Sequence, residues 1–267
     1  MKYSFLFLRY TWITNYAFFD VLKEGYQTLF IPKTGTYSFE VIAAGNQRSH
    51  EFPGARICGK IRLERGEKIT VALGQQSESS GGSGGTFVVK NTGKFIMPGF
   101  SMPLFIAGGT GFSSSINFGR ASLAQTAHGN NQVGSSGVQI YQSGDVQNFY
   151  CAGAGFRQTP NVGQLCERSE PPQNYLNGLM GGKGFNHSVR IEDEGGFGGG
   201  GASFIRRLNG IQKYYYGAGG GFTGGSTRIQ DSSHCDGGGG GSFSSDQNAT
   251  FDYKYEKFGK CKIEFLN

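Results

Sequence analysis

Glycine constrains the fold of this chain more than any other feature. It accounts for 47 of the 267 residues, about 18 %, and much of it lies in four runs at residues 81–85, 195–201, 217–225 and 237–241. An average protein has roughly 7 % glycine. The chain also has 23 Phe and 13 Tyr, whereas disordered segments are poor in aromatic residues. We therefore expect a folded protein in which glycine segments are part of the packing.

Two common uses of glycine do not fit these runs. Flexible linkers separate independent domains and are rich in polar residues, but here Phe197, Phe222 and Phe243 interrupt or border the runs. Phosphate-binding loops carry the pattern G-x-G-x-x-G between a strand and a helix. The pattern occurs twice, from Gly196 and from Gly219, but at this glycine content roughly one match is expected by chance. Neither match is followed by the GK[ST] of a nucleotide-binding loop.

The remaining interpretation is a bundle of polyproline-II-like glycine strands. Residues without a Cβ allow backbones to approach closely, and the buried backbone groups must then hydrogen-bond to one another. We predict that residues 195–243 are ordered in this way and anchored at their edges by Phe197, Phe222, Phe243 and Cys235. The glycines assigned to this packing are Gly81, Gly82, Gly84, Gly85, Gly198, Gly199, Gly200, Gly201, Gly219, Gly220, Gly221, Gly237, Gly238 and Gly239.

Outside the glycine runs the sequence indicates strands and no sustained helical period. Residues 28–32 and 36–43 are predicted to form a hairpin, and so are residues 55–64 and 68–73. In the second of these runs Tyr37, Phe39 and Val41 alternate with polar residues, so one face is expected to be buried. A strand after Asn248 is expected to return and pair with the first strands, because its backbone groups need partners.

These signals predict an all-β protein, a jelly-roll β-sandwich with an inserted glycine bundle. Strands at 26–107 and 248–267 form the sandwich, and residues 108–247 form the insert of a single domain, 26–267. Residues 1–25 are an N-terminal extension, interpreted as a degenerate export signal or an edge strand. No stretch has the roughly 18 apolar residues that a membrane helix requires, so we expect no membrane insertion.

Charge and cysteine usage bear on partners and compartment. The net charge is +6, but the charges are scattered and Arg-Gly-Gly repeats are absent, so nucleic acid is not an expected partner. The five cysteines contain no C-x-x-C pair, which disfavours zinc and redox motifs. We predict a disulfide between Cys151 and Cys166 in an oxidising compartment. Asn186 and Asn248 begin N-x-S/T sequons and are candidate glycosylation sites.

The sequence contains no recognisable catalytic constellation. The four histidines are isolated from one another, and the adjacent residues of His234-Cys235-Asp236 point in different directions in any extended segment. Glu192-Asp193-Glu194 lacks the spaced oxygen ligands of a calcium loop. We expect no enzyme activity, no cofactor and no metal. Trp12 and the run from Tyr214 to Tyr216 fit either partner contacts or core packing.

Blocks of the sequence resemble the glycine-rich extracellular domain of the anaplastic lymphoma kinase and leukocyte tyrosine kinase receptors. The blocks follow in order from about Tyr26 to Leu266, and the Leu-Gly-Gln-Gln at 73–76 followed by glycine and Thr-Phe-Val-Val at 86–89 is the most specific of them. Others are residues 31–37, 41–45, 59–67, 197–201, 219–225, 236–243 and 259–263.

The resemblance implies a tumour-necrosis-factor-like sandwich fused to a polyglycine bundle, serving as a cytokine-binding ectodomain. The chain contains no kinase domain or membrane helix, and the glycine expected after Ala44 is replaced by residues 46–53. We expect a non-catalytic module, extracellular or at the cell surface, that binds a cytokine-like protein as a receptor ectodomain or part of one. The alternative is a standalone adhesin or matrix protein that binds a surface glycan.

Overall fold

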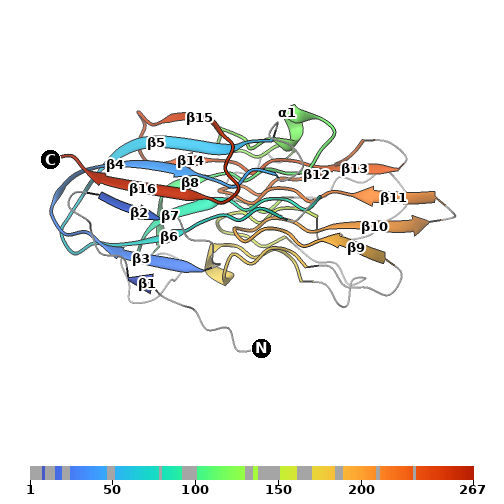
Figure 1. Cartoon of the computed structure of the whole chain (residues 1–267), viewed down its shortest axis with the longest axis horizontal. Coiled ribbons are helices and arrows are strands. Elements are labelled where there is room, and N and C mark those ends of the chain that lie inside the picture. The colour runs from blue at the N-terminus through green and yellow to red at the C-terminus, as the bar shows by residue number, and fades with distance from the viewer. Residues whose placement is uncertain are drawn as a thin grey trace.

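The structure is a computed structural model and is almost entirely built of strands and extended segments (Figure 1). It describes residues 8–9, 16–19, 25–46, 52–77, 80–91, 101–129, 135–137, 151–160, 170–183, 189–208, 211–230 and 233–267. In these residues the only helices are two single turns, α1 (Ile116–Gly119) and the 3-10 turn η1 (Tyr175–Asn177). The all-β prediction is confirmed.

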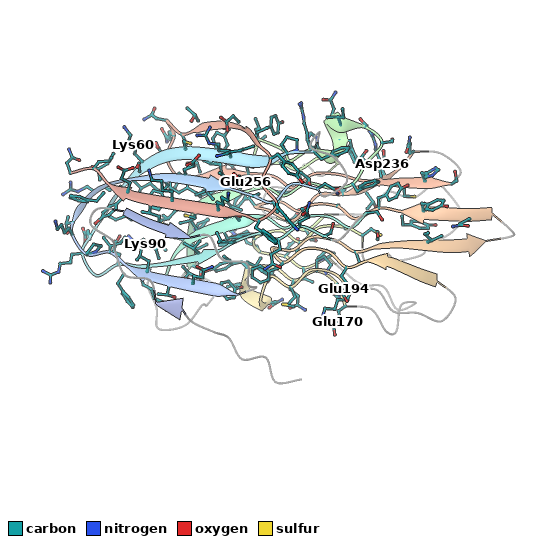
Figure 2. All side chains as sticks on the ribbon, in the orientation of Figure 1. Lys60, Lys90, Glu170, Glu194, Asp236 and Glu256 are labelled. Atoms are coloured by element: carbon teal, nitrogen blue, oxygen red, sulfur yellow. The ribbon has the colours of Figure 1, made fainter. Side chains whose placement is uncertain are left out.

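Two mainly antiparallel sheets form a sandwich. The six-stranded sheet has the order β1 (Leu8–Arg9), β3 (Tyr26–Phe30), β6 (Lys68–Ala72), β7 (Thr86–Asn91), β8 (Ser101–Ala107) and β14 (Phe243–Ser244). The five-stranded sheet has the order β15 (Thr250–Lys254), β5 (Gly54–Leu63), β4 (Gly35–Ile42), β16 (Lys260–Phe265) and β2 (Tyr16–Phe19). Its outer face carries polar side chains, among them the exposed Lys60 (Figure 2).

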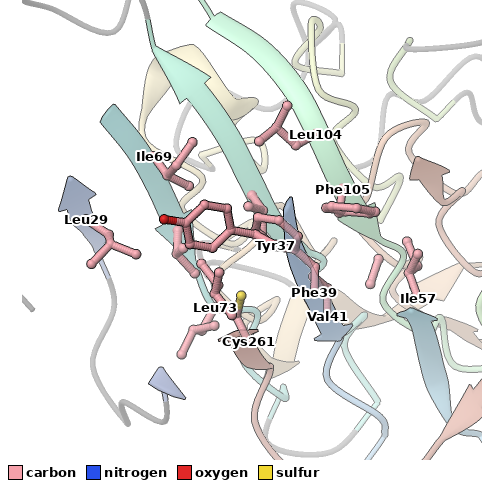
Figure 3. Close-up of a cluster of buried hydrophobic side chains, with 14 of the residues drawn as sticks. Leu29, Tyr37, Phe39, Val41, Ile57, Ile69, Leu73, Leu104, Phe105 and Cys261 are labelled. Atoms are coloured by element: carbon pink, nitrogen blue, oxygen red, sulfur yellow. The ribbon is translucent and has the colours of Figure 1, made fainter. Parts of the chain in front are cut away.

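The core of the sandwich follows from side-chain alternation along its strands. Tyr37, Phe39 and Val41 of β4 point inward, as the sequence predicted, and meet inward residues of the six-stranded sheet (Figure 3). The ring centroids of Phe39 and Phe105 are 4.9 Å apart. The C-terminal strand β16 pairs with β4, which confirms the expected return of the chain end.

The two predicted hairpins are wrong. Strand β3 pairs with β6 and strand β4 pairs with β5, so the turn at residues 31–34 carries the chain from one sheet to the other. The turn at residues 64–67 does the same in reverse, between β5 and β6. Each strand buries one face against the opposite sheet, and that long-range burial outweighs local pairing across a short turn.

The six-stranded sheet is also covered on its second face. Phe87 and Ile106 of this sheet pack against Tyr175, Phe197 and Phe222 from the middle of the chain. Phe243 is partly buried in the same cluster, and the centroids of its ring and the Phe222 ring are 4.5 Å apart. The three phenylalanines that border the glycine runs therefore anchor these runs to the sandwich, as predicted.

A third sheet lies at the other end of the long axis, beyond the glycine segments (Figure 1). Its order is β12 (Thr227–Ile229), β13 (His234–Gly237), β11 (Ile211–Tyr215), β10 (Ser203–Leu208) and β9 (Val189–Asp193). The sequence analysis did not predict this sheet. A search of the described residues for a helix of membrane-spanning length and hydropathy finds none.

Candidate functional site

The glycine segments are joined by backbone hydrogen bonds that repeat every three residues. Along residues 217–222, the six successive N–H groups donate in turn to three segments and then to the same three again. The acceptors, in order, are the carbonyls of Ser80, Cys151, Gly238, Ser83, Ala154 and Gly241. Each N–H therefore points about one third of a turn away from the one before it. We call residues 80–85, 108–112, 151–156, 195–201, 217–225 and 237–242 the glycine lattice.

The segment at 237–242 has the same period. Its N–H groups donate, in order, to the carbonyls of Phe112, Ser226, Phe118, Gly109, Thr223 and Ala124. These acceptors belong to three neighbouring segments, 108–112, 223–226 and 118–124, each visited twice. A β-strand would instead alternate between two neighbours.

Close packing explains why these positions are glycine. A Cβ on Gly220 would overlap the carbonyl oxygen of Gly198, and one on Gly82 would overlap that of Ala218. Of the fourteen glycines that the sequence analysis assigned to packing, all but Gly199 would place a Cβ less than 3.0 Å from another atom. Gly199 has φ of +83° and would meet the Ala154 side chain at 3.0 Å. These glycine positions therefore have no room for a side chain, and the large side chains of the region stand at the boundary of the lattice.

At one boundary, five half-buried or buried rings form a row. The centroid distances are 6.3 Å for Phe52 to Phe112, 4.6 Å for Phe112 to Tyr216, 6.2 Å for Tyr216 to His234 and 5.2 Å for His234 to Tyr214. His234 lies at 24° to Tyr216 and 9° to Tyr214, so its ring is nearly parallel to both tyrosine rings. We call these five residues the aromatic row.

Backbone bonds fix the row in place. The N–H of Phe112 donates to Gly217 and its carbonyl accepts from Gly237, so Phe112 is part of the lattice. Tyr214 pairs directly with His234 across the parallel strands β11 and β13. The rings are thus positioned by the glycine packing beneath them.

Strand alternation places the three tyrosines of the run in two different environments. Tyr215 is 7 % exposed and packs with Cys151 and Cys235, whereas Tyr214 and Tyr216 are half-buried on the opposite face. Core packing therefore accounts for Tyr215, and partner contact stays a prediction for Tyr214 and Tyr216. The sequence analysis missed Phe52, Phe112 and His234 as members of the row, because they lie far apart in the chain. The sequence signal that could have separated Tyr214 and Tyr216 from Tyr215 is the alternation of side chains along a strand.

The His234-Cys235-Asp236 triplet does not form a cluster. His234 belongs to the row, Cys235 packs toward Tyr215, and Asp236 is fully buried beneath α1. The Asp236 carboxylate accepts hydrogen bonds from the N–H and hydroxyl of Ser114 at 3.2 and 3.4 Å, and Arg228 lies 3.6 Å away. Asp236 therefore holds the α1 loop against the third sheet.

The backbone of His128 attaches the segment that follows α1 to the lattice. His128 donates its N–H to Gly239 and accepts from Ser226, which attaches the segment around α1 to two glycine runs. Burial lowers the pKa of the His128 imidazole, and the charges of Arg120 and Arg228 lower this pKa further. The ring is therefore neutral where a free histidine would begin to protonate.

Several predicted site residues remain apart or lie outside the description. Cys166, Asn186 and Trp12 lie outside the described residues, so the Cys151–Cys166 disulfide stays a prediction. The described cysteines form no disulfide with one another. Burial raises the pKa of the Cys58 and Cys261 thiols, which keeps both protonated. In the described part of the chain, no three His, Cys, Asp or Glu side chains are grouped as metal ligands.

A scan against protein-family models and a search of curated proteins find no match to this chain. The resemblance to receptor ectodomains thus stays a prediction that rests on the sequence blocks. The site itself is defined by its geometry alone, a rigid row of rings at the edge of the glycine lattice.

We expect Gly220→Ala to lower the free energy of unfolding by about 3 kcal/mol or more, because the new methyl group overlaps a backbone carbonyl that cannot move alone. The matched control is Gly66→Ala, at a turn with φ of +87° and no atom within 4 Å of the new Cβ. It should cost only the strain of a left-handed residue, roughly 1–2 kcal/mol. Urea unfolding of both variants checks this, and equal losses would contradict the close packing.

Acid should destabilise the fold through His128. Because the pKa of His128 is lower in the folded state than in the unfolded chain, the unfolded state binds more protons below about pH 6.5. This contribution to stability is fully present above that pH and is lost as the pH falls toward the folded pKa. The variant His128→Asn, measured from about pH 7.5 to about pH 5, should lose less stability than the parent chain. A parallel decline of both would refute this role.

Proposed function

We propose that this chain is a non-catalytic extracellular binding module that recognises a protein ligand through the aromatic row. The observation that carries the proposal is the row itself: half-exposed Tyr, His and Phe rings positioned by backbone bonds to the glycine lattice. Aromatic residues dominate the energetics of protein interfaces, and rings that are already ordered lose little entropy on binding. The ordered sequence blocks that resemble those of cytokine-binding receptor ectodomains motivate the ligand class.

Ring orientation favours a protein over the alternative partner, a glycan. A sugar ring packs on an open face of an aromatic ring, whereas the His234 ring lies nearly parallel to Tyr214 and Tyr216 and stacks with them. Stacked rings offer their edges to a partner. The tyrosine hydroxyls lie at such edges, and tyrosine combines an apolar body with a polar tip. A standalone adhesin is the second candidate, supported by the rigid backbone that the glycine lattice gives the row.

The finer description of the fold is part of this proposal. We assign the sandwich to the jelly-roll type, since consecutive strands cross between its sheets. We assign the lattice segments to polyproline-II-like helices, because such a helix has three residues per turn and its N–H groups point to three directions in succession. The period of three at residues 217–222 and 237–242 supports this assignment.

Amide exchange tests the ordering of the lattice. We expect the amides of Gly219, Gly220 and Gly221 to exchange slowly, since each donates within the buried lattice. The amide of Lys33, in an exposed turn, serves as the fast internal reference. Unprotected glycine amides would favour flexible linkers and remove the rigid support of the aromatic row.

Binding is tested by arrays of secreted proteins and of glycans, probed with the purified chain. For a protein that binds, Tyr214→Ala should weaken affinity by about 2 kcal/mol or more, roughly thirtyfold. Tyr216→Phe, which keeps the ring that packs on Phe112, isolates the contribution of the hydroxyl. The matched control is Tyr253→Ala, a half-buried tyrosine of the sandwich that stacks under Arg120. Binding to glycans alone, or equal losses in all three variants, would refute the proposal.

A further inference from the structure

The outer face of the five-stranded sheet carries an open hollow that the aromatic row does not involve. Its volume is about 490 Å³, within the roughly 300–1,000 Å³ typical of small-ligand sites. It lies along β4, β5 and the start of the edge strand β15, and Lys60 marks its position (Figure 2). Its lining includes Ser38, Cys58, Lys60, Asp246, Asn248 and Thr250.

A rigid turn presents Asn248 at this hollow. The Asp246 carboxylate accepts from the N–H of Lys60 at 2.7 Å and from the N–H of Asn248 at 2.9 Å. The first bond fastens the turn to β5, and the second shapes the turn itself. The Ser244 hydroxyl adds bonds to the backbone of Asp246 at 3.0 Å in both directions. The turn is therefore held without any help from the side chain of Asn248.

The side chains of Asn248 and Thr250 are exposed and take no part in the hydrogen bonds described above. Together with Ala249 they form the sequon N-x-T, the acceptor of N-linked sugar in secreted proteins. An asparagine that only shaped the turn would use its side-chain oxygen, the role that Asp246 already fills. The exposed amide nitrogen of Asn248 is instead available for a covalent bond.

We propose that Asn248 is N-glycosylated and that the sugar next to the protein lies in the hollow between β4, β5 and β15. This inference rests on the proposed extracellular function, because the sugar is attached during export. In the transfer, the Asn248 amide nitrogen forms a bond to C1 of a lipid-linked N-acetylglucosamine, the lipid pyrophosphate leaves, and the nitrogen loses a proton. The hydroxyl of Ser38 and the ammonium of Lys60 supply hydrogen-bonding groups for the sugar in the hollow.

The position also explains what the sugar does. Among the described strands, β15 pairs with β5 alone and forms the edge of its sheet. An edge strand presents unpaired backbone groups to other chains, and proteins protect such edges. A sugar beside the start of β15 hinders pairing there and leaves open the aromatic row, which extends from Phe52, before the start of β5, to β11 and β13.

The test is expression of the full chain behind an export leader in eukaryotic cells, with mass analysis of the peptide that contains Asn248. The peptide is taken from secreted and cell-retained protein alike. We expect one glycan mass on this peptide, lost in Asn248→Gln and Thr250→Ala and kept in Thr250→Ser, which preserves the sequon. An unmodified Asn248 in the parent chain and in Thr250→Ser overturns the site, while the array result for the aromatic row stands independently.

A second measurement tests whether the sugar lies in the hollow. Enzymatic removal of the glycan from the native protein should be faster when Ser38 and Lys60 are both replaced by Ala. Equal rates of glycan removal from the parent chain and this variant would show that the sugar does not lie in the hollow. Glycosylation of Asn248 together with no protein binding on the array would instead refute the proposed function and leave the glycan site intact.

Discussion

Backbone hydrogen bonding between segments without side chains is the interaction on which this structure depends. A buried N–H or C=O without a partner costs free energy comparable to a lost hydrogen bond. In a sheet each strand meets this requirement with two neighbours, but residues 217–222 and 237–242 meet it with three or more. Three backbone segments can surround a fourth this closely only where the residues between them have no Cβ. Fixing so many glycines is entropically unfavourable, and the dense bonding together with the apolar cluster at one side offsets that loss.

The six-stranded sheet packs between the glycine lattice and the five-stranded sheet and so connects them. Its two faces are both buried, one against the five-stranded sheet and the other against Phe197, Phe222 and their neighbours. Strand β7 reflects this position, since nearly all its side chains are buried. The strands and the lattice also share segments, because β7 continues directly from the glycine run at 81–85 and β14 follows the run at 237–241. Sandwich and lattice are thus parts of one packed unit.

The sequence predicted the features that depend on local pattern. Strand alternation placed Tyr37, Phe39 and Val41 in the core, and phenylalanines bordering glycine runs indicated anchored segments. It failed where pairing is set by distant residues. The turns at 31–34 and 64–67 look like hairpin turns, but burial between two sheets divides the strands they join. The aromatic row was only partly predictable, because Phe52, Phe112 and His234 lie far apart in the sequence and the bonds that hold Phe112 have no local signature.

The same packing rule determines where function can reside. Inside the lattice every position that lacks a Cβ also lacks chemistry, so side chains that can meet a partner occur only where the lattice ends. At the edge of the lattice, strands β11 and β13 lead into two glycine runs. Their pairing places Tyr214, Tyr216 and His234 side by side. The bonds that order Gly217 and Gly237 also hold Phe112, the next ring in the row. The rigidity of the surface is therefore a consequence of the glycine content, because each ring is attached to backbone that can move only if its neighbouring segments move with it.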